Sequence, residues 1–192
     1  MFHKLKSEKD MVYHFVVLSD EVDDFRREID IDAEATFQEL NDLLLKTCGY
    51  KKDLMTSFFL CDEYWDKLQE ITAMDMNDDP RKEPAPLMSH THLSDIITDE
   101  EAHNKAKLMF EFDLMCERYL YMQLKEVKDH AHLLQPAVTL EKGKAPKQEG
   151  DIDSMFRDLD TSDMYGEDEF NEDELDMEDG FQSLEDMEAG GY

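Results

Sequence analysis

The sequence lacks the features that mark secreted and membrane proteins. It has only three cysteines, Cys48, Cys61 and Cys116, which lie far apart and form no Cys-x-x-Cys pair. An odd, scattered set argues against a disulfide framework, and their apolar neighbours favour buried free thiols in a reducing compartment. No apolar run approaches the roughly 18 residues that a membrane span needs, and the N-terminus has no apolar stretch of signal-peptide type. We therefore expect a cytoplasmic protein.

Basic residues are also scarce. The 192 residues include 20 lysines and arginines against 49 aspartates and glutamates, a formal charge of −29 at pH 7. Because Lys and Arg supply most of the affinity for DNA phosphates and anionic lipids, we expect neither a nucleic-acid nor a membrane partner. The charge favours solubility and basic partners, and it leaves the oligomeric state open. A solvated acidic surface is its simplest interpretation.

Motifs of catalysis and cofactor binding are missing as well. The sequence has no Gly-rich phosphate loop, no Gly-x-Ser-x-Gly elbow and no Cys-His signature. With 49 carboxylates, adjacent acidic residues occur throughout and do not indicate paired-carboxylate catalysis. We therefore expect no catalytic residues and no cofactor.

Two His-x-His pairs, His90 with His92 and His130 with His132, are the remaining metal candidates. On a strand this spacing puts both imidazoles on one face, but zinc needs at least a third ligand. Surface histidines are the simpler interpretation, and we expect no metal site.

Charge divides the chain into two parts. Residues 149–192 contain 18 acidic residues and one basic residue, a balance of −17, whereas residues 1–148 carry −12. We expect a folded domain over 1–148 and a disordered acidic tail over 149–192, since charge repulsion there is not offset by burial. Large apolar residues recur in the tail, a pattern typical of segments that fold on a partner. The possible partner-binding residues are Met155, Phe156, Leu159, Phe170, Leu175, Phe181 and Leu184. A passive solubilising tail is an equal alternative.

The first part reads as an α+β domain, a small mixed or antiparallel sheet with helices packed on it. Residues 11–19 are apolar on both faces, as in a central strand, with a buried, hydrogen-bonded His14; a half-exposed strand, 25–32, completes a hairpin. Thr36 and Glu39 form a capping box and Gly49 ends the helix. Strands are expected at 56–61 and 64–72, one or two helical turns at 93–97, and a second hairpin from 108–113 and 119–124. Pro136, Gly143 and Pro146 indicate an extended, loop-rich end of the domain.

This order of elements and three sequence runs resemble the plasmid pRiA4b ORF-3-like family, which is also labelled an insertion-sequence passenger TnpR family and is associated with bacterial mobile elements. The runs are VLSDEVDDFRREI (Val17–Ile29), CGYKKDLMTSFF (Cys48–Phe59) and QEITAMDM (Gln69–Met76). The similarity extends over about residues 11–147. It implies an α+β fold with helices packed on a sheet, and it implies no activity, because none is established for the family.

The chain departs from the family pattern in the second hairpin. Many members have an aromatic-Asp-Phe-Gly-Asp-x-Trp-x-His run; here Phe112-Asp113 are kept, but Leu114-Met115-Cys116 replace Phe-Gly-Asp. Arg118 and Leu120 stand where Trp and His would fall. A metal or acid-base role for that run therefore has no support in this chain. Recombinase chemistry is also unsupported, since Ser7 and Ser19 lack arginine neighbours and no basic helix is present.

These observations favour a non-enzymatic protein-interaction module whose acidic tail contacts a partner of unknown identity. The alternative is a cryptic metal-dependent or hydrolytic enzyme, which would require the histidines or selected carboxylates to converge in one concave site.

Overall fold

The computed structural model describes residues 10–74, 81, 83–98 and 105–149. The chain divides into two units, Met1–Asp151 and Ile152–Tyr192, and all described residues belong to the first. The predicted tail, 149–192, thus lies outside the described residues apart from Glu149.

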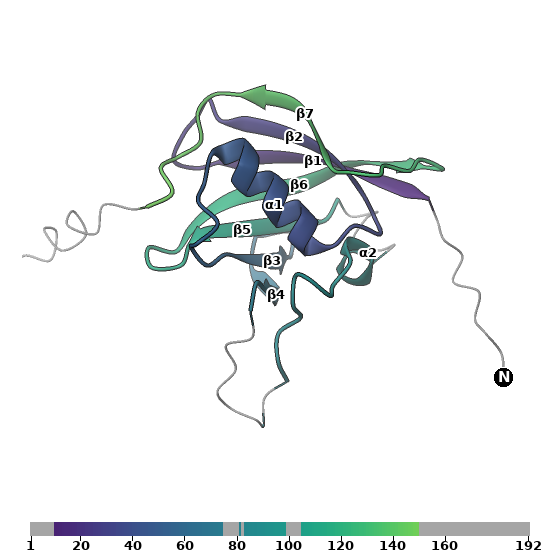
Figure 1. Cartoon of the computed structure of the whole chain (residues 1–192), viewed down its shortest axis with the longest axis horizontal. Helices are drawn as coiled ribbons and strands as arrows, with labels where there is room; N and C mark the ends of the chain where they lie inside the picture. Colours follow the sequence, from purple (N-terminus) through teal and green to yellow (C-terminus); the bar gives the residue numbers. More distant parts are fainter. Residues whose placement is uncertain (1–9, 75–80, 82, 99–104, 150–192) are drawn as a thin grey trace, which may run out of the picture. The chain divides into compact units, whose positions relative to one another are not determined.

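Seven strands form one antiparallel sheet within the described residues (Figure 1). Its order is β4-β3-β5-β6-β1-β2-β7, so β1 lies in the interior, as its two apolar faces predict. The strands are β1 (Met11–Ser19), β2 (Arg26–Asp32), β3 (Ser57–Cys61), β4 (Lys67–Thr72), β5 (Lys107–Asp113), β6 (Arg118–Asp129) and β7 (Ala137–Lys142).

Both predicted hairpins are confirmed. In the first, β1 pairs with β2 and Phe15 lies opposite Ile29; in the second, β5 pairs with β6 and Phe110 lies opposite Leu120. The strand predicted at 64–72 begins only at Lys67, because the residues before it form the turn from β3.

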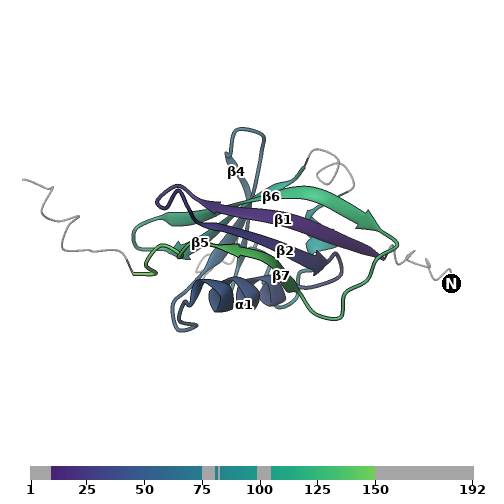
Figure 2. The same cartoon turned by 90° about the horizontal axis from the view of Figure 1, so that it is seen from above.

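The helix α1 (Phe37–Cys48) has the predicted ends. The Thr36 side chain accepts from the Glu39 amide at 3.2 Å, and the Glu39 carboxylate accepts from the Thr36 amide at 2.8 Å. Gly49 adopts φ 71°, the left-handed conformation that glycine reaches at low cost. The short helix α2 (Leu93–Ile96) confirms the predicted turns. Figure 2 shows α1 on one side of the sheet.

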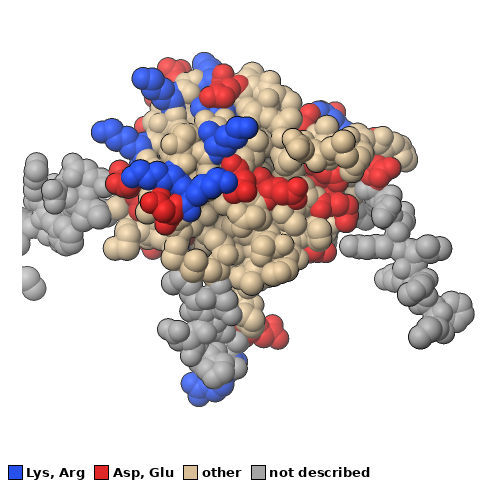
Figure 3. Space-filling view, viewed as in Figure 1, with Lys and Arg blue, Asp and Glu red and all other residues tan. Residues whose placement is uncertain are grey.

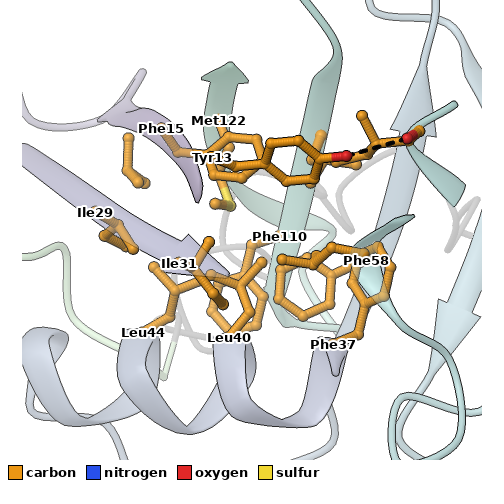
Figure 4. Close-up of a cluster of buried hydrophobic side chains, with 14 of the residues drawn as sticks. Tyr13, Phe15, Ile29, Ile31, Phe37, Leu40, Leu44, Phe58, Phe110 and Met122 are labelled. Carbon is orange, nitrogen blue, oxygen red and sulfur yellow. Dashed lines mark hydrogen bonds between the residues drawn. The ribbon is translucent and has the colours of Figure 1, made fainter. Parts of the chain in front are cut away.

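The core lies between α1 and the sheet. Phe37, Leu40 and Leu44 of α1 point toward Phe58 and Phe110 of the sheet, and all five side chains are fully buried (Figure 4). The Phe58 ring packs between Phe37 and Phe110, at 5.3 and 5.0 Å between centroids. Burying a side chain of this size contributes about 1.5–3 kcal/mol, so these contacts hold α1 against the strands.

The prediction of an extended, loop-rich end after the second hairpin missed one strand, because Ala137–Lys142 forms β7 and pairs with β2. Five of the six residues are exposed, and Val138 and Leu140 alternate as in a strand, but Pro136 and Gly143 on either side indicate a loop. The strand geometry of these six residues comes from hydrogen bonding to β2, a partner more than 100 residues away.

With seven strands and two short helices among the described residues, the fold is α+β with the sheet dominant. Among the described residues, no helix is long and apolar enough to cross a bilayer.

Candidate functional site

The two faces of the sheet differ. One face packs against α1, and neither described helix packs against the opposite face, which we call the outer face. Because successive side chains of a strand alternate between faces, the strand register aligns outer-face residues in rows. Phe59 of β3, Met109 of β5 and Tyr121 of β6 form one row, and Glu111 and Tyr119 lie in the next.

Four half-buried rings lie on this outer face, over β3, β5 and β6. Phe59 meets Tyr119 edge to face at 6.4 Å between centroids, and Trp65 meets Tyr121 in the same way at 5.1 Å. Beneath them Met109 is only 5% exposed, although no described helix covers it. We call the four rings, together with Lys67 and Lys107, the outer aromatic surface.

Trp65 reaches this surface from a strained turn. Its φ is 71°, a conformation that costs a bulky residue about 1–3 kcal/mol. The carboxylate of Asp62 holds the turn by accepting from the amides of Tyr64 and Asp66 at 2.8 and 2.9 Å, and the Trp65 amide donates to the Asp62 carbonyl at 3.2 Å. The turn thus holds the indole over Tyr121 at an energetic cost.

Two lysines place their ammonium groups over these rings. Lys67 Nζ lies 4.0 Å from the Phe59 centroid and 4.6 Å from that of Tyr119, and it donates to the Tyr119 hydroxyl at 2.9 Å. Lys107 Nζ lies 4.9 Å from the Trp65 centroid. Ring quadrupoles attract such cations from the face.

A buried carboxylate lies at the centre of the same surface. Glu111 is 7% exposed, and burial raises the pKa of its carboxyl, opposed by a hydrogen bond with Tyr119 and by the charge of Lys67. Glu70 accepts from the Ser57 hydroxyl at 3.0 Å nearby, and its charge adds to the increase in the Glu111 pKa. The site thus combines aromatic rings, two ammonium groups and two carboxylates.

The sequence alone did not reveal this site, because its rings come from residues 59, 65, 119 and 121 and each belongs to an ordinary-looking strand or turn. The one available signal was that residues 119–124 have large side chains on both alternating faces.

His14 is hydrogen-bonded as expected, although it is half-buried rather than fully buried: its Nδ1 lies 2.6 Å from Asp30 Oδ1.

The histidine pairs do not form a shared site in the part of the chain described. His92 Nδ1 contacts the Glu34 carbonyl at 2.5 Å, whereas His132 Nδ1 contacts the Asp32 carboxylate at 2.6 Å. Within the described ranges, no three His, Cys, Asp or Glu side chains gather as metal ligands would.

The three cysteines are free, as predicted, but only Cys61 is fully buried. Burial raises the pKa of the Cys48 thiol to about 12 and that of Cys61 to about 11. Both thiols are therefore protonated at neutral pH, and a protonated thiol is a poor nucleophile.

Arg118, which departs from the resembled family pattern, joins three segments. Its guanidinium donates to Glu21 at 2.6 and 2.8 Å and to Asp113 at 3.3 Å, and to the carbonyl of Gln148 at 3.3 Å. Its position ties the turn after β1 and the turn after β5 to the end of the domain, so its role in the fold is structural.

Basic side chains gather at one end of the side shown in Figure 3, beside acidic ones. Three lysines of the domain form ion pairs with carboxylates: Lys51 with Glu149, Lys52 with Asp42, and Lys142 with Asp24. A groove of about 330 Å³ lies between α1 and Pro136, and the Lys52–Asp42 pair is part of its lining. Paired charges of this kind offer little to a phosphate backbone.

The seven tail residues proposed for partner binding, from Met155 to Leu184, lie outside the described residues.

Comparisons with protein-family models and with curated proteins gave no match. A solved structure is similar: a protein of unknown function, MM3350 from Methanosarcina mazei Go1, matches with a TM-score of 0.59 and 19% identity. The match covers 83% of this chain and 87% of that one. At this identity the likeness concerns the fold alone.

Proposed function

We propose that this chain is a non-enzymatic protein-interaction module that contacts its partner through the outer aromatic surface. The observation that carries the proposal is Trp65, which a strained turn holds at φ 71° against Tyr121 on a face that neither described helix covers. Trp and Tyr dominate the binding energy of protein interfaces, because they bury large areas at low entropic cost. Strain that the surroundings maintain is typical of functional positions.

The test is partner capture by the full chain, comparing the parent protein with Trp65→Gly. Glycine adopts φ 71° without strain, so this change removes the indole and spares the turn. We expect the captured partner to be lost. Leu134→Ala is the matched control, because Leu134 is 89% exposed and belongs to no part of the surface. Equal capture by all three proteins would refute the proposal.

The acidic segment is proposed as a second contact. Its spaced Phe, Leu and Met residues support this, since a purely solvating segment needs no large apolar side chains. Replacing Phe156, Phe170 and Phe181 together by Ser leaves the charge unchanged. We expect weaker capture of the same partner, whereas unchanged capture would reduce the segment to a solubilising role.

A hydrolytic activity is the alternative function, and Glu111 is the residue that favours it. Its carboxyl has a raised pKa and a tyrosine partner, which suits a general acid. Any hydrolysis by the protein should then be lost in Glu111→Gln.

We further propose a cytoplasmic location, supported by three free cysteines. Membership of the resembled plasmid pRiA4b ORF-3-like family stays a prediction.

A further inference from the structure

The outer aromatic surface already holds cations. Lys67 Nζ lies over the Phe59 and Tyr119 rings, at 4.0 and 4.6 Å from their centroids, and Lys107 Nζ lies over the Trp65 ring at 4.9 Å from its centroid. Lys67 is an exposed residue of β4 and Lys107 a half-buried residue of β5, and β3 lies between these two strands. Each ring position is therefore one that an ammonium group can reach from solvent and that attracts it.

Negative charge lies around the rings. The Glu111 side chain forms a hydrogen bond with Tyr119, and the negative charge of its carboxylate is one of the causes that raise the pKa of Lys67. Glu70 of the edge strand β4 and Asp20, 3.5 Å from the Tyr121 hydroxyl, add to it. Rings together with carboxylates attract lysine and arginine side chains more strongly than either group alone.

The charge of the whole domain has the same sign. Residues 1–148 carry −12, a field that draws basic partners toward the surface and repels nucleic acids. An acidic occupant would meet repulsion both from this field and from the carboxylates near the rings.

We propose that the ring positions held by Lys67 and Lys107 are docking positions for lysine and arginine side chains of a basic segment of a partner protein. The incoming side chains displace the two resident ammonium groups, which return to solvent. This inference rests on the proposed function of the surface, and it adds the chemistry of the partner.

Trp65 provides a local readout, because it is the single tryptophan of the chain. Full-length protein is titrated with a synthetic arginine-rich peptide, and the Trp65 emission is followed. We expect saturable quenching that weakens as salt is raised, and no response to a glutamate-rich peptide or a single-stranded oligonucleotide. Basic peptide that binds only to the acidic segment 149–192 would leave Trp65 emission unchanged, and that result would overturn the proposal. A response to the oligonucleotide alone would identify a phosphate-binding surface and would overturn it equally.

Two variants separate ring binding from net charge. Lys67→Ala and Lys125→Ala remove the same charge, but Lys125 is exposed on β6 and lies over none of the rings. We expect Lys67→Ala to tighten peptide binding about two- to fivefold relative to Lys125→Ala, because the short alanine side chain leaves the ring position vacant. Equal effects of the two variants would refute displacement. Lys107→Ala tests the same displacement at Trp65 should Lys67→Ala fail to fold.

The inference and the proposed function can fail separately. If Trp65→Gly abolishes partner capture while the arginine-rich peptide gives no Trp65 response, the surface binds a partner but not through cations. If Trp65→Gly leaves partner capture unchanged, the proposed function itself is wrong.

Discussion

Arg27 is the residue on which the contacts between β2, β7 and the end of α1 converge. Arg27 is 2% exposed, and its side chain donates to Thr47 Oγ1 at 3.0 Å and to the carbonyls of Lys142 and Gly143 at 2.7 and 3.2 Å. Its guanidinium also stacks 4.6 Å from the Phe25 centroid. The planar guanidinium of arginine has five N–H donors in fixed directions, which suits these acceptors, whereas the ammonium group of a lysine could not make the same set of hydrogen bonds.

Replacing Arg27 by Met should cost about 3 kcal/mol of unfolding free energy, because the hydrogen bonds that this buried guanidinium donates to Thr47 and to the carbonyls of Lys142 and Gly143 are lost together. Urea unfolding of the full chain measures this. Arg26→Met is the matched control: Arg26 is exposed, pairs with Glu28 at 2.6 Å, and should cost less than about 1 kcal/mol. Similar losses for the two variants would contradict the proposed role of Arg27.

Asp30 links stability to pH. Burial acts to raise the pKa of its carboxyl, but hydrogen bonds from Lys128 and His14 outweigh it and hold the pKa below its usual value. A lowered folded-state pKa stabilises the protein above the usual aspartate pKa of about 3.9, and this contribution is lost as pH falls below that value.

Asp30→Asn should therefore cost about 1–2 kcal/mol at pH 7, and the difference from the parent protein should shrink in unfolding experiments below about pH 4. Lys128→Met should remove part of the same contribution, so the double variant should lose less than the sum of the two single losses. A constant difference between about pH 7 and pH 3 would contradict this linkage.

At the scale of elements, β7 depends on the turn after it. Gly143 has φ 69°, and a Cβ there would lie 2.4 Å from the carbonyl oxygen of Asp24. Gly49, at the end of α1, has φ 71° with no atom within 4 Å of an added Cβ. The two positions share a backbone conformation and differ in space.

Gly49→Ala should cost about 1 kcal/mol, the conformational penalty alone. Gly143→Ala should cost clearly more, because backbone must move away from the new methyl group. Thermal unfolding of the two variants compares them directly, and hydrogen exchange of the β7 amides locates the damage. Equal midpoints would mean that the approach of Gly143 to Asp24 is not needed for β7 to pair.

For the whole molecule, a charge of −29 opposes compactness through self-repulsion. Raising the ionic strength from about 0.01 M to 0.15 M shortens the Debye length from about 30 Å to about 8 Å. The unfolding midpoint should then rise by about 2–4 °C, a gain of about 1 kcal/mol for a chain of this size. The rise should disappear near the isoelectric point of 4.3, and a midpoint independent of salt at pH 7 would show that repulsion is unimportant.

Local signals determined a large part of the fold. Thr36, Glu39 and Gly49 define α1 because capping acts between residues three or four positions apart. The alternation of Leu108, Phe110 and Phe112 identified β5 in the same way, and short turns made its hairpin partner clear. Charge balance determined the boundary expected near residue 148 and the acid-rich character of the segment beyond it.

Only the tertiary structure decided which distant segments meet. β7 pairs with β2, more than 100 residues away along the chain, and Arg27 of β2 donates to the Gly143 carbonyl just after β7. The outer aromatic surface likewise brings Trp65 from a turn onto Tyr121 of β6. Capping and alternation act over a few residues, whereas strand order and ring contacts depend on the free energy of packing the whole sheet, which no local pattern contains.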